Sequence, residues 1–120
     1  MDATEALTKL LSTSLSHKRE RYVDFASRPK AQKKLLNDLY HKLIDCFDPK
    51  HMVSQLPASA WSTPAYGYAP PRTFGVRWSS LKDAILDRGS DDAYLLVTED
   101  GLYGVYCQED CFGGPIFIRA

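Results

Sequence analysis

The sequence has 120 residues, of which 44% are hydrophobic and 25% charged, and its 15 basic residues balance 15 acidic ones. This composition predicts one globular domain, residues 1–120, and argues against wholesale disorder and against a dedicated nucleic-acid-binding protein. No apolar run is long enough for a transmembrane helix, and the N-terminus lacks the apolar core of a secretory signal. We therefore expect a cytoplasmic protein, and three cysteines, an odd number, favour a reducing compartment over a disulfide framework.

The chain begins with a helical pattern. Asp2 and Glu5 have the spacing of a capping box, in which two residues cap the start of a helix. Leucines follow at helical spacing, and apolar residues resume after the serine-rich residues 12–16, which are poor helix formers. We predict a helix over residues 3–27, in one or two pieces.

A second helix is predicted over residues 29–47. Pro29 suits the first turn of a helix. The apolar residues that follow recur at spacings of three and four, as on a helix with one buried face: Leu35, Leu36, Leu39, Leu43, Ile44 and Phe47. Lys33 and Lys34 fall on the other side. Because the connection is short, the two predicted helices should form an antiparallel pair.

Residues 48–72 have a different character, since five of the seven prolines fall there. This density excludes a long helix or a central strand. Large aromatic side chains nevertheless lie in the segment, and rings of this size usually need burial or a partner. We expect an irregular strap that crosses the domain.

A short strand and a short helix are predicted next. Thr73–Trp78 alternates apolar residues with Gly75 and Arg77, which indicates a strand or an extended arm. Ser80 has the position of an N-cap, with Asp83 three residues later. The predicted helix has Leu81, Ala84 and Ile85 on its apolar face, and Gly89 stands where a cap glycine ends a helix.

The C-terminal third contains the strongest local signal, two apolar runs joined by Asp100-Gly101. A two-residue turn at this point pairs six residues of one strand with six of the other: Glu99 with Leu102, Thr98 with Tyr103, Val97 with Gly104, Leu96 with Val105, Leu95 with Tyr106 and Tyr94 with Cys107. Both faces of this hairpin are largely apolar, so we expect both to be covered. Gly104 is interpreted as a packing glycine. A third strand over Pro115–Arg119 completes a meander.

Together these elements predict an α+β fold. An N-terminal antiparallel helical pair (residues 1–47) packs on a small C-terminal antiparallel sheet, a β-meander. The irregular strap (48–72) and one short helix lie between them, and the short strand, the helix and the meander occupy residues 73–120.

The leading functional hypothesis is a non-catalytic intracellular binding module. Aromatic residues combined with arginine are typical of interface hot spots, and such residues gather in and after the strap: Trp61, Tyr66, Tyr68, Arg72, Phe74 and Trp78. The partner would be a protein, either a second copy or another chain. The alternative interpretation is that these rings close the core beneath the strap.

No motif compels a chemistry, so the sequence favours a protein that is not an enzyme and predicts no cofactor or metal. His41, Asp45, Asp48 and His51 are close in sequence but are interpreted as polar groups at a helix end. Cys46 is read as a small core residue, and Cys107 and Cys111 as ordinary thiols. A small enzyme, with His41, Asp45 and Cys107 between helices and sheet, is the alternative.

Nucleic-acid binding is a further alternative, through the basic face from Lys18 to Lys34. The charges are unevenly distributed along the chain: residues 1–60 carry 10 basic and 7 acidic groups, and residues 61–120 carry 5 basic and 8 acidic groups. The zero net charge makes nucleic acid an unlikely partner, and a solvated helical face explains the basic run equally well. No membrane association is expected.

Overall fold

The structure, a computed structural model, describes residues 1–14, 19–35, 37, 49–69, 73–88, 93–107 and 115–120. Its helices are α1 (Ala3–Ser14), α2 (Arg19–Ser27), α4 (Ala58–Trp61) and α5 (Leu81–Arg88), with the 3-10 helices η1 (Pro29–Ala31) and η2 (Pro49–His51). Its strands are β1 (Met52–Val53), β2 (Ala65–Ala69), β3 (Thr73–Trp78), β4 (Tyr94–Thr98), β5 (Tyr103–Cys107) and β6 (Ile116–Arg119). The predicted α+β class is confirmed.

The described strands form one antiparallel sheet in the order β1-β6-β5-β4-β2-β3. The predicted meander is its β4-β5-β6 part, and four of the six predicted pairs of the hairpin are present in its register, from Tyr94 opposite Cys107 to Val97 opposite Gly104. The turn itself closes one residue earlier than predicted, because the Gly101 amide donates to the Thr98 carbonyl at 2.8 Å. Gly101 takes a left-handed conformation, φ +73°, which lets the chain return without changing the register.

The strap contains regular structure, which corrects the prediction for residues 48–72. β2 is an internal strand that pairs with β3 on one side and β4 on the other. Its five residues lie between Pro64 and Pro70, so no proline removes a ladder hydrogen bond. The density of prolines over the whole segment concealed a short stretch that is free of them.

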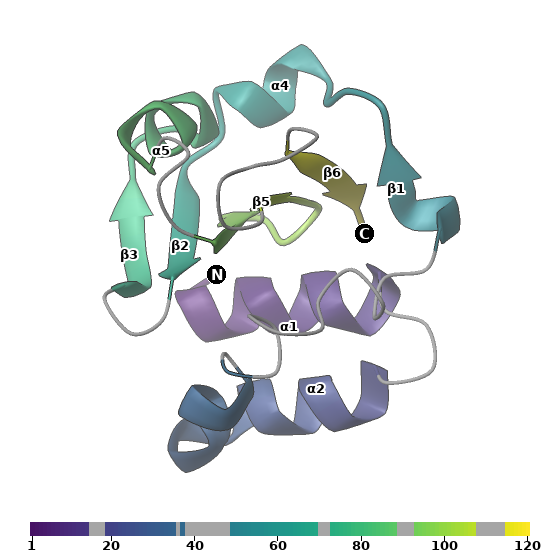
Figure 1. The fold of residues 1–120 in the computed structure, drawn as a ribbon, viewed down its shortest axis with the longest axis vertical. Coiled ribbons are helices and arrows are strands. Elements are labelled where there is room, and N and C mark those ends of the chain that lie inside the picture. Colours follow the sequence, from purple (N-terminus) through teal and green to yellow (C-terminus); the bar gives the residue numbers. More distant parts are fainter. Residues whose placement is uncertain (15–18, 36, 38–48, 70–72, 89–92, 108–114) are drawn as a thin grey trace.

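The two faces of the sheet carry separate hydrophobic clusters, and both faces are covered as predicted (Figure 1). α1 covers one face, where Leu7, Leu10 and Leu11 pack with sheet residues that include Leu95 and Val97. On the other face Leu81 and Ala84 of α5 and Ala60 of α4 pack with sheet residues. The alternation of side chains along the hairpin therefore places each apolar set against its own helical layer.

The helix predicted over residues 3–27, in one or two pieces, is present in two pieces. The first predicted helix is divided into α1 and α2, and these two pack against each other, with α2 on the side of α1 away from the sheet (Figure 1). α1 ends at Ser14, within the serine-rich stretch, whose residues are poor helix formers. Of the second predicted helix, the structure describes η1, helical residues 32–35 and residue 37; Leu35 is fully buried. The remaining predicted stripe residues lie outside the described residues.

Both predicted N-terminal caps are confirmed. The Glu5 amide donates to Asp2 Oδ1 at 2.8 Å and the Asp2 amide donates to Glu5 Oε1 at 3.3 Å, which completes the capping box of α1. The Asp83 amide donates to Ser80 Oγ at 3.1 Å at the start of α5. Gly89 lies outside the described residues. Among the described helices, none has the length and apolar character needed to cross a membrane.

Candidate functional site: a basic pocket around Phe25

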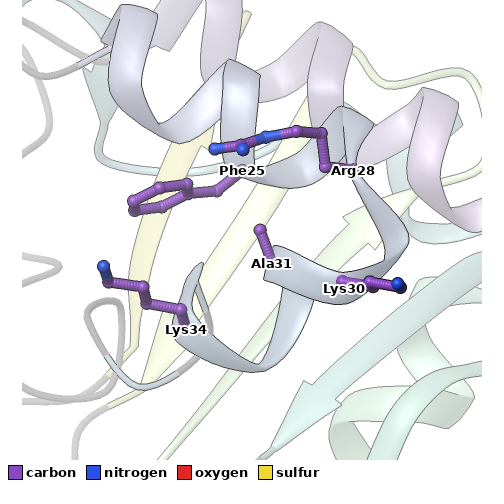
Figure 2. Close-up of a pocket in the computed structure, with 5 residues that line it drawn as sticks. All are labelled: Phe25, Arg28, Lys30, Ala31 and Lys34. Atoms are coloured by element: carbon purple, nitrogen blue, oxygen red, sulfur yellow. The ribbon is translucent and has the colours of Figure 1, made fainter.

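A cavity among the described residues lies where α2 ends and the chain turns. Arg28 forms a bend because the following Pro29 disfavours helical conformation at that position. η1 then carries the chain back across the end of α2. The turn opens a pocket of about 610 Å³ that is lined by Phe25, Arg28, Lys30, Ala31 and Lys34 (Figure 2). We call it the Phe25 pocket.

Three cationic groups converge on the ring of Phe25. The distance to the ring centroid is 5.3 Å for Arg21 Cζ, 5.9 Å for Arg28 Cζ and 5.4 Å for Lys34 Nζ. All lie within the range of cation–π attraction. In Figure 2 the Arg28 and Lys34 side chains extend along the two sides of the ring, whereas Lys30 points away from it. Positively charged side chains from α2, from the bend and from the helical residues after η1 thus lie around one phenyl ring.

The positive charge of this pocket is only partly compensated. Arg28 Nη2 lies 2.5 Å from Asp24 Oδ2 on the preceding helical turn, in a pair whose two side chains are more than half exposed. An exposed pair of this kind contributes little to stability. No ion pair with Lys30 or Lys34 occurs in the part of the chain that the structure describes. The pocket therefore has a positive rim.

The floor of the pocket belongs to the hydrophobic core. Phe25 is only 8% exposed, and its ring meets the buried Tyr22 edge-on at a centroid distance of 6.5 Å. The segment that forms the opposite wall is held by Gln32, whose Nε2 donates to Thr4 Oγ1 at 3.0 Å and to the Ala26 carbonyl at 3.3 Å. These contacts connect the walls of the pocket to α1 and α2, so its shape is preformed.

The aromatic residues predicted to form a contact surface lie on both faces of the sheet. Tyr66 and Tyr68 are buried beneath α1, where their hydroxyls donate to the carbonyls of Met1, at 2.9 Å, and Ala3, at 2.6 Å. Burial raises the pKa of the Tyr68 phenol above its ordinary value, and Asp2 and Tyr66 add to the increase. These two tyrosines attach the start of α1 to β2.

The two predicted tryptophans are half-buried on the opposite face. The Trp61 ring meets Phe117 edge-on at 5.7 Å, and Trp78 Nε1 donates to Asp87 Oδ2 at 3.0 Å. Each ring has one side against the cluster that α4 and α5 cover. Arg72 and the Phe74 side chain lie outside the described residues. The structure thus separates Tyr66 and Tyr68 from Trp61 and Trp78 by the thickness of the sheet.

Of the residues proposed for catalysis, Cys107 alone lies within the described residues. His41 and Asp45 lie outside the described residues, as does Asp48 of the possible metal cluster. Cys107 is fully buried and disulfide-bonded, so the prediction of an ordinary thiol was wrong. Three cysteines can form one disulfide and leave one thiol, so an odd number of cysteines is not evidence for a reducing compartment. The other cysteines, Cys46 and Cys111, lie outside the described residues.

Sequence reasoning identified the basic run but not the pocket. The sequence places Phe25 within the predicted helix over residues 3–27 and explains the cations as a solvated helical face. The local signal for the pocket is Pro29, after which the chain turns and Lys34 comes to lie beside Phe25. Comparisons with protein-family models, curated proteins and solved structures find no match for this chain.

Proposed function

We propose that the protein is a non-catalytic binding module that holds an anionic partner at the Phe25 pocket. The observation that carries this proposal is the convergence of Arg21, Arg28 and Lys34 on one ring, at 5.3 to 5.9 Å, beside an open cavity. Like charges gathered in this way repel one another, and an anion between them relieves the repulsion.

An added anion is a better partner for these cations than the Phe25 ring, in terms of free energy. A cation–π contact at an exposed site contributes about 0.5–1 kcal/mol, whereas a hydrogen bond to a charged group contributes about 1.5–3 kcal/mol. Lys34 has no ion pair among the described residues, so it can bind an anion without losing an existing partner. Phe25 and Ala31 exclude water from one side of the pocket, which strengthens the attraction.

The test compares two adjacent lysines. Lys34→Glu reverses a charge that lines the pocket, and Lys33→Glu reverses an exposed charge that does not line it. At low ionic strength we expect the unmodified protein to bind immobilised heparin, a general polyanion, and to elute as salt is added. Lys34→Glu should elute at a clearly lower salt concentration than Lys33→Glu. No retention at low salt, or equal losses for the two variants, would contradict the proposal.

Of the aromatic surface predicted from the sequence, the part on β3, with Phe74 and Trp78, is proposed as a second contact region. The observation in its favour is Val76, which is 48% exposed on β3, the strand at the end of the sheet order. A free edge strand can pair with another chain. Val76→Lys should then reduce concentration-dependent self-association in sedimentation experiments without changing the unfolding midpoint. Self-association that is unchanged in this variant counts against the second surface.

A further inference from the structure

We infer that the anionic partner is an acidic peptide segment of a protein, which places one apolar side chain in the Phe25 pocket and its carboxylates against Arg28 and Lys34. This inference rests on the proposed function and names the class of partner. It follows from the size of the pocket, from the character of its walls and from the arrangement of its cations.

The volume of the pocket argues against a simple inorganic anion as its occupant. Its volume of about 610 Å³ is roughly twenty times the volume that one molecule occupies in liquid water, about 30 Å³. It falls in the range of pockets that hold organic ligands, about 300–1,000 Å³. An occupant that fills it must therefore bring many atoms besides its charge.

The walls require that part of the occupant be apolar. Phe25 and Ala31 present only carbon atoms from their side chains, and the stems of Arg28, Lys30 and Lys34 are aliphatic. Charged groups stand only at the ends of these stems. The complementary ligand has an apolar centre flanked by negative charges, as in a peptide with a hydrophobic residue between acidic ones.

The arrangement of the cations favours such a peptide over a nucleic acid. Single-stranded nucleic acid binds along a basic groove and stacks its bases on accessible aromatic faces. Here three cations lie over a ring that is only 8% exposed, so Phe25 offers no open face on which a base could stack. An apolar side chain needs no such face, because it can also pack against Ala31 and the aliphatic stems of the lining residues.

Carboxylates are also the anions that this surface already accepts. Arg28 binds the Asp24 carboxylate from its own helix, and the planar guanidinium is suited to carboxylate pairing. Lys34, on the other side of the Phe25 ring in Figure 2, offers a second anchor. Two carboxylates on either side of an apolar residue can reach both cations while the apolar residue enters the pocket.

The experiment measures fluorescence anisotropy with three labelled probes: the peptide Glu-Glu-Phe-Glu-Glu, the equally charged peptide Glu-Glu-Ser-Glu-Glu, and a short oligothymidylate. We expect the phenylalanine peptide to bind about tenfold more tightly than the serine peptide, because burying an aromatic ring adds roughly that factor. Ala31→Leu, which fills the pocket without changing charge, should reduce this preference to less than about twofold. Lys34→Glu should weaken both peptides, and Lys33→Glu should leave them nearly unchanged.

The outcomes separate this inference from the proposed function. The inference of a peptide partner is overturned if the two peptides bind with equal affinity, or if oligothymidylate binds more tightly than either peptide. In both cases retention on heparin would still support the proposed binding of an anionic partner. Heparin retention without binding of either peptide also overturns it. The comparison of the two peptides uses the unmodified protein, so it decides the matter even if Ala31→Leu does not fold.

Discussion

Leu10 of α1 rests directly on Gly104 of β5: a Cβ atom added to Gly104 would lie 2.6 Å from Leu10 Cδ2 and 3.3 Å from the Leu96 carbonyl oxygen. Leu10 is fully buried, so its side chain has little space into which to move. The predicted role of Gly104 as a packing residue is thereby explained, because the missing side chain lets the helix approach the sheet closely. This contact sets the distance between the helical layer and the strands.

Gly104→Ala should therefore destabilise the protein by about 1–3 kcal/mol, the usual range for overpacking a core. The free energy of unfolding is measured by urea denaturation. Leu10→Ala alone should also destabilise, because it leaves a cavity. In the double variant the alanine at 104 occupies part of that cavity, so the two losses should not add. Additive losses would show that the contact is not the cause.

Gly101 is constrained in two ways, since its φ is +73° and an added Cβ would lie 2.8 Å from Lys9 Cβ and 3.0 Å from the Ala6 carbonyl oxygen. Gly101→Ala should cost more than the left-handed conformation alone, which is about 1–2 kcal/mol. Asparagine tolerates that conformation but also carries a Cβ, so Gly101→Asn should restore only part of the loss. Full recovery in the asparagine variant would show that the close approach to α1 is unimportant.

The hydroxyl of Tyr68 should contribute about 1 kcal/mol through its bond to the Ala3 carbonyl at 2.6 Å. Tyr68→Phe tests this in urea denaturation at pH 7. Tyr66→Phe is the matched control, and it should cost less because its acceptor residue, Met1, is 53% exposed. A larger loss in the control would contradict the assignment of Tyr68 as the main anchor of α1.

The stability of the protein should also fall above about pH 10, partly because of Tyr68. Burial raises the folded-state pKa of this phenol, so the unfolded chain releases the proton first, near the ordinary tyrosine pKa of about 10. The stabilisation is thus present below that pH and is lost as the pH rises above it. Unfolding free energies measured between pH 9 and 11 should decline less steeply in Tyr68→Phe; parallel declines would exclude the contribution.

The disulfide of Cys107 predicts that one of the three cysteines keeps a free thiol. Thiol titration of the denatured, unreduced protein should then give one thiol per chain, and titration after reduction should give three. Reduction should lower the free energy of unfolding by about 2–4 kcal/mol, the common range for disulfides. Three thiols before reduction, in protein purified without reductant, would contradict the bond.

The sequence by itself determined the features that depend on neighbouring residues. The caps at Asp2 and Ser80, the strand Thr73–Trp78, the register of the hairpin and its two apolar faces all follow from local hydrogen bonds and from the period of the side chains. The basic run from Lys18 to Lys34 could also be recognised from the sequence, because its residues are close neighbours. The arrangement of its side chains around Phe25 could not.

Only the tertiary structure decided which distant groups meet. It made Ala65–Ala69 an internal strand, divided the aromatic residues between two faces, bonded Cys107 in a disulfide and gathered Arg28 and Lys34 around Phe25. A short strand becomes stable only when partners arrive on both sides, and a turn at one proline decides where the next side chains point. The internal strand pairs residues that lie far apart in the sequence, whereas the candidate site joins near neighbours that the turn at Pro29 brings together.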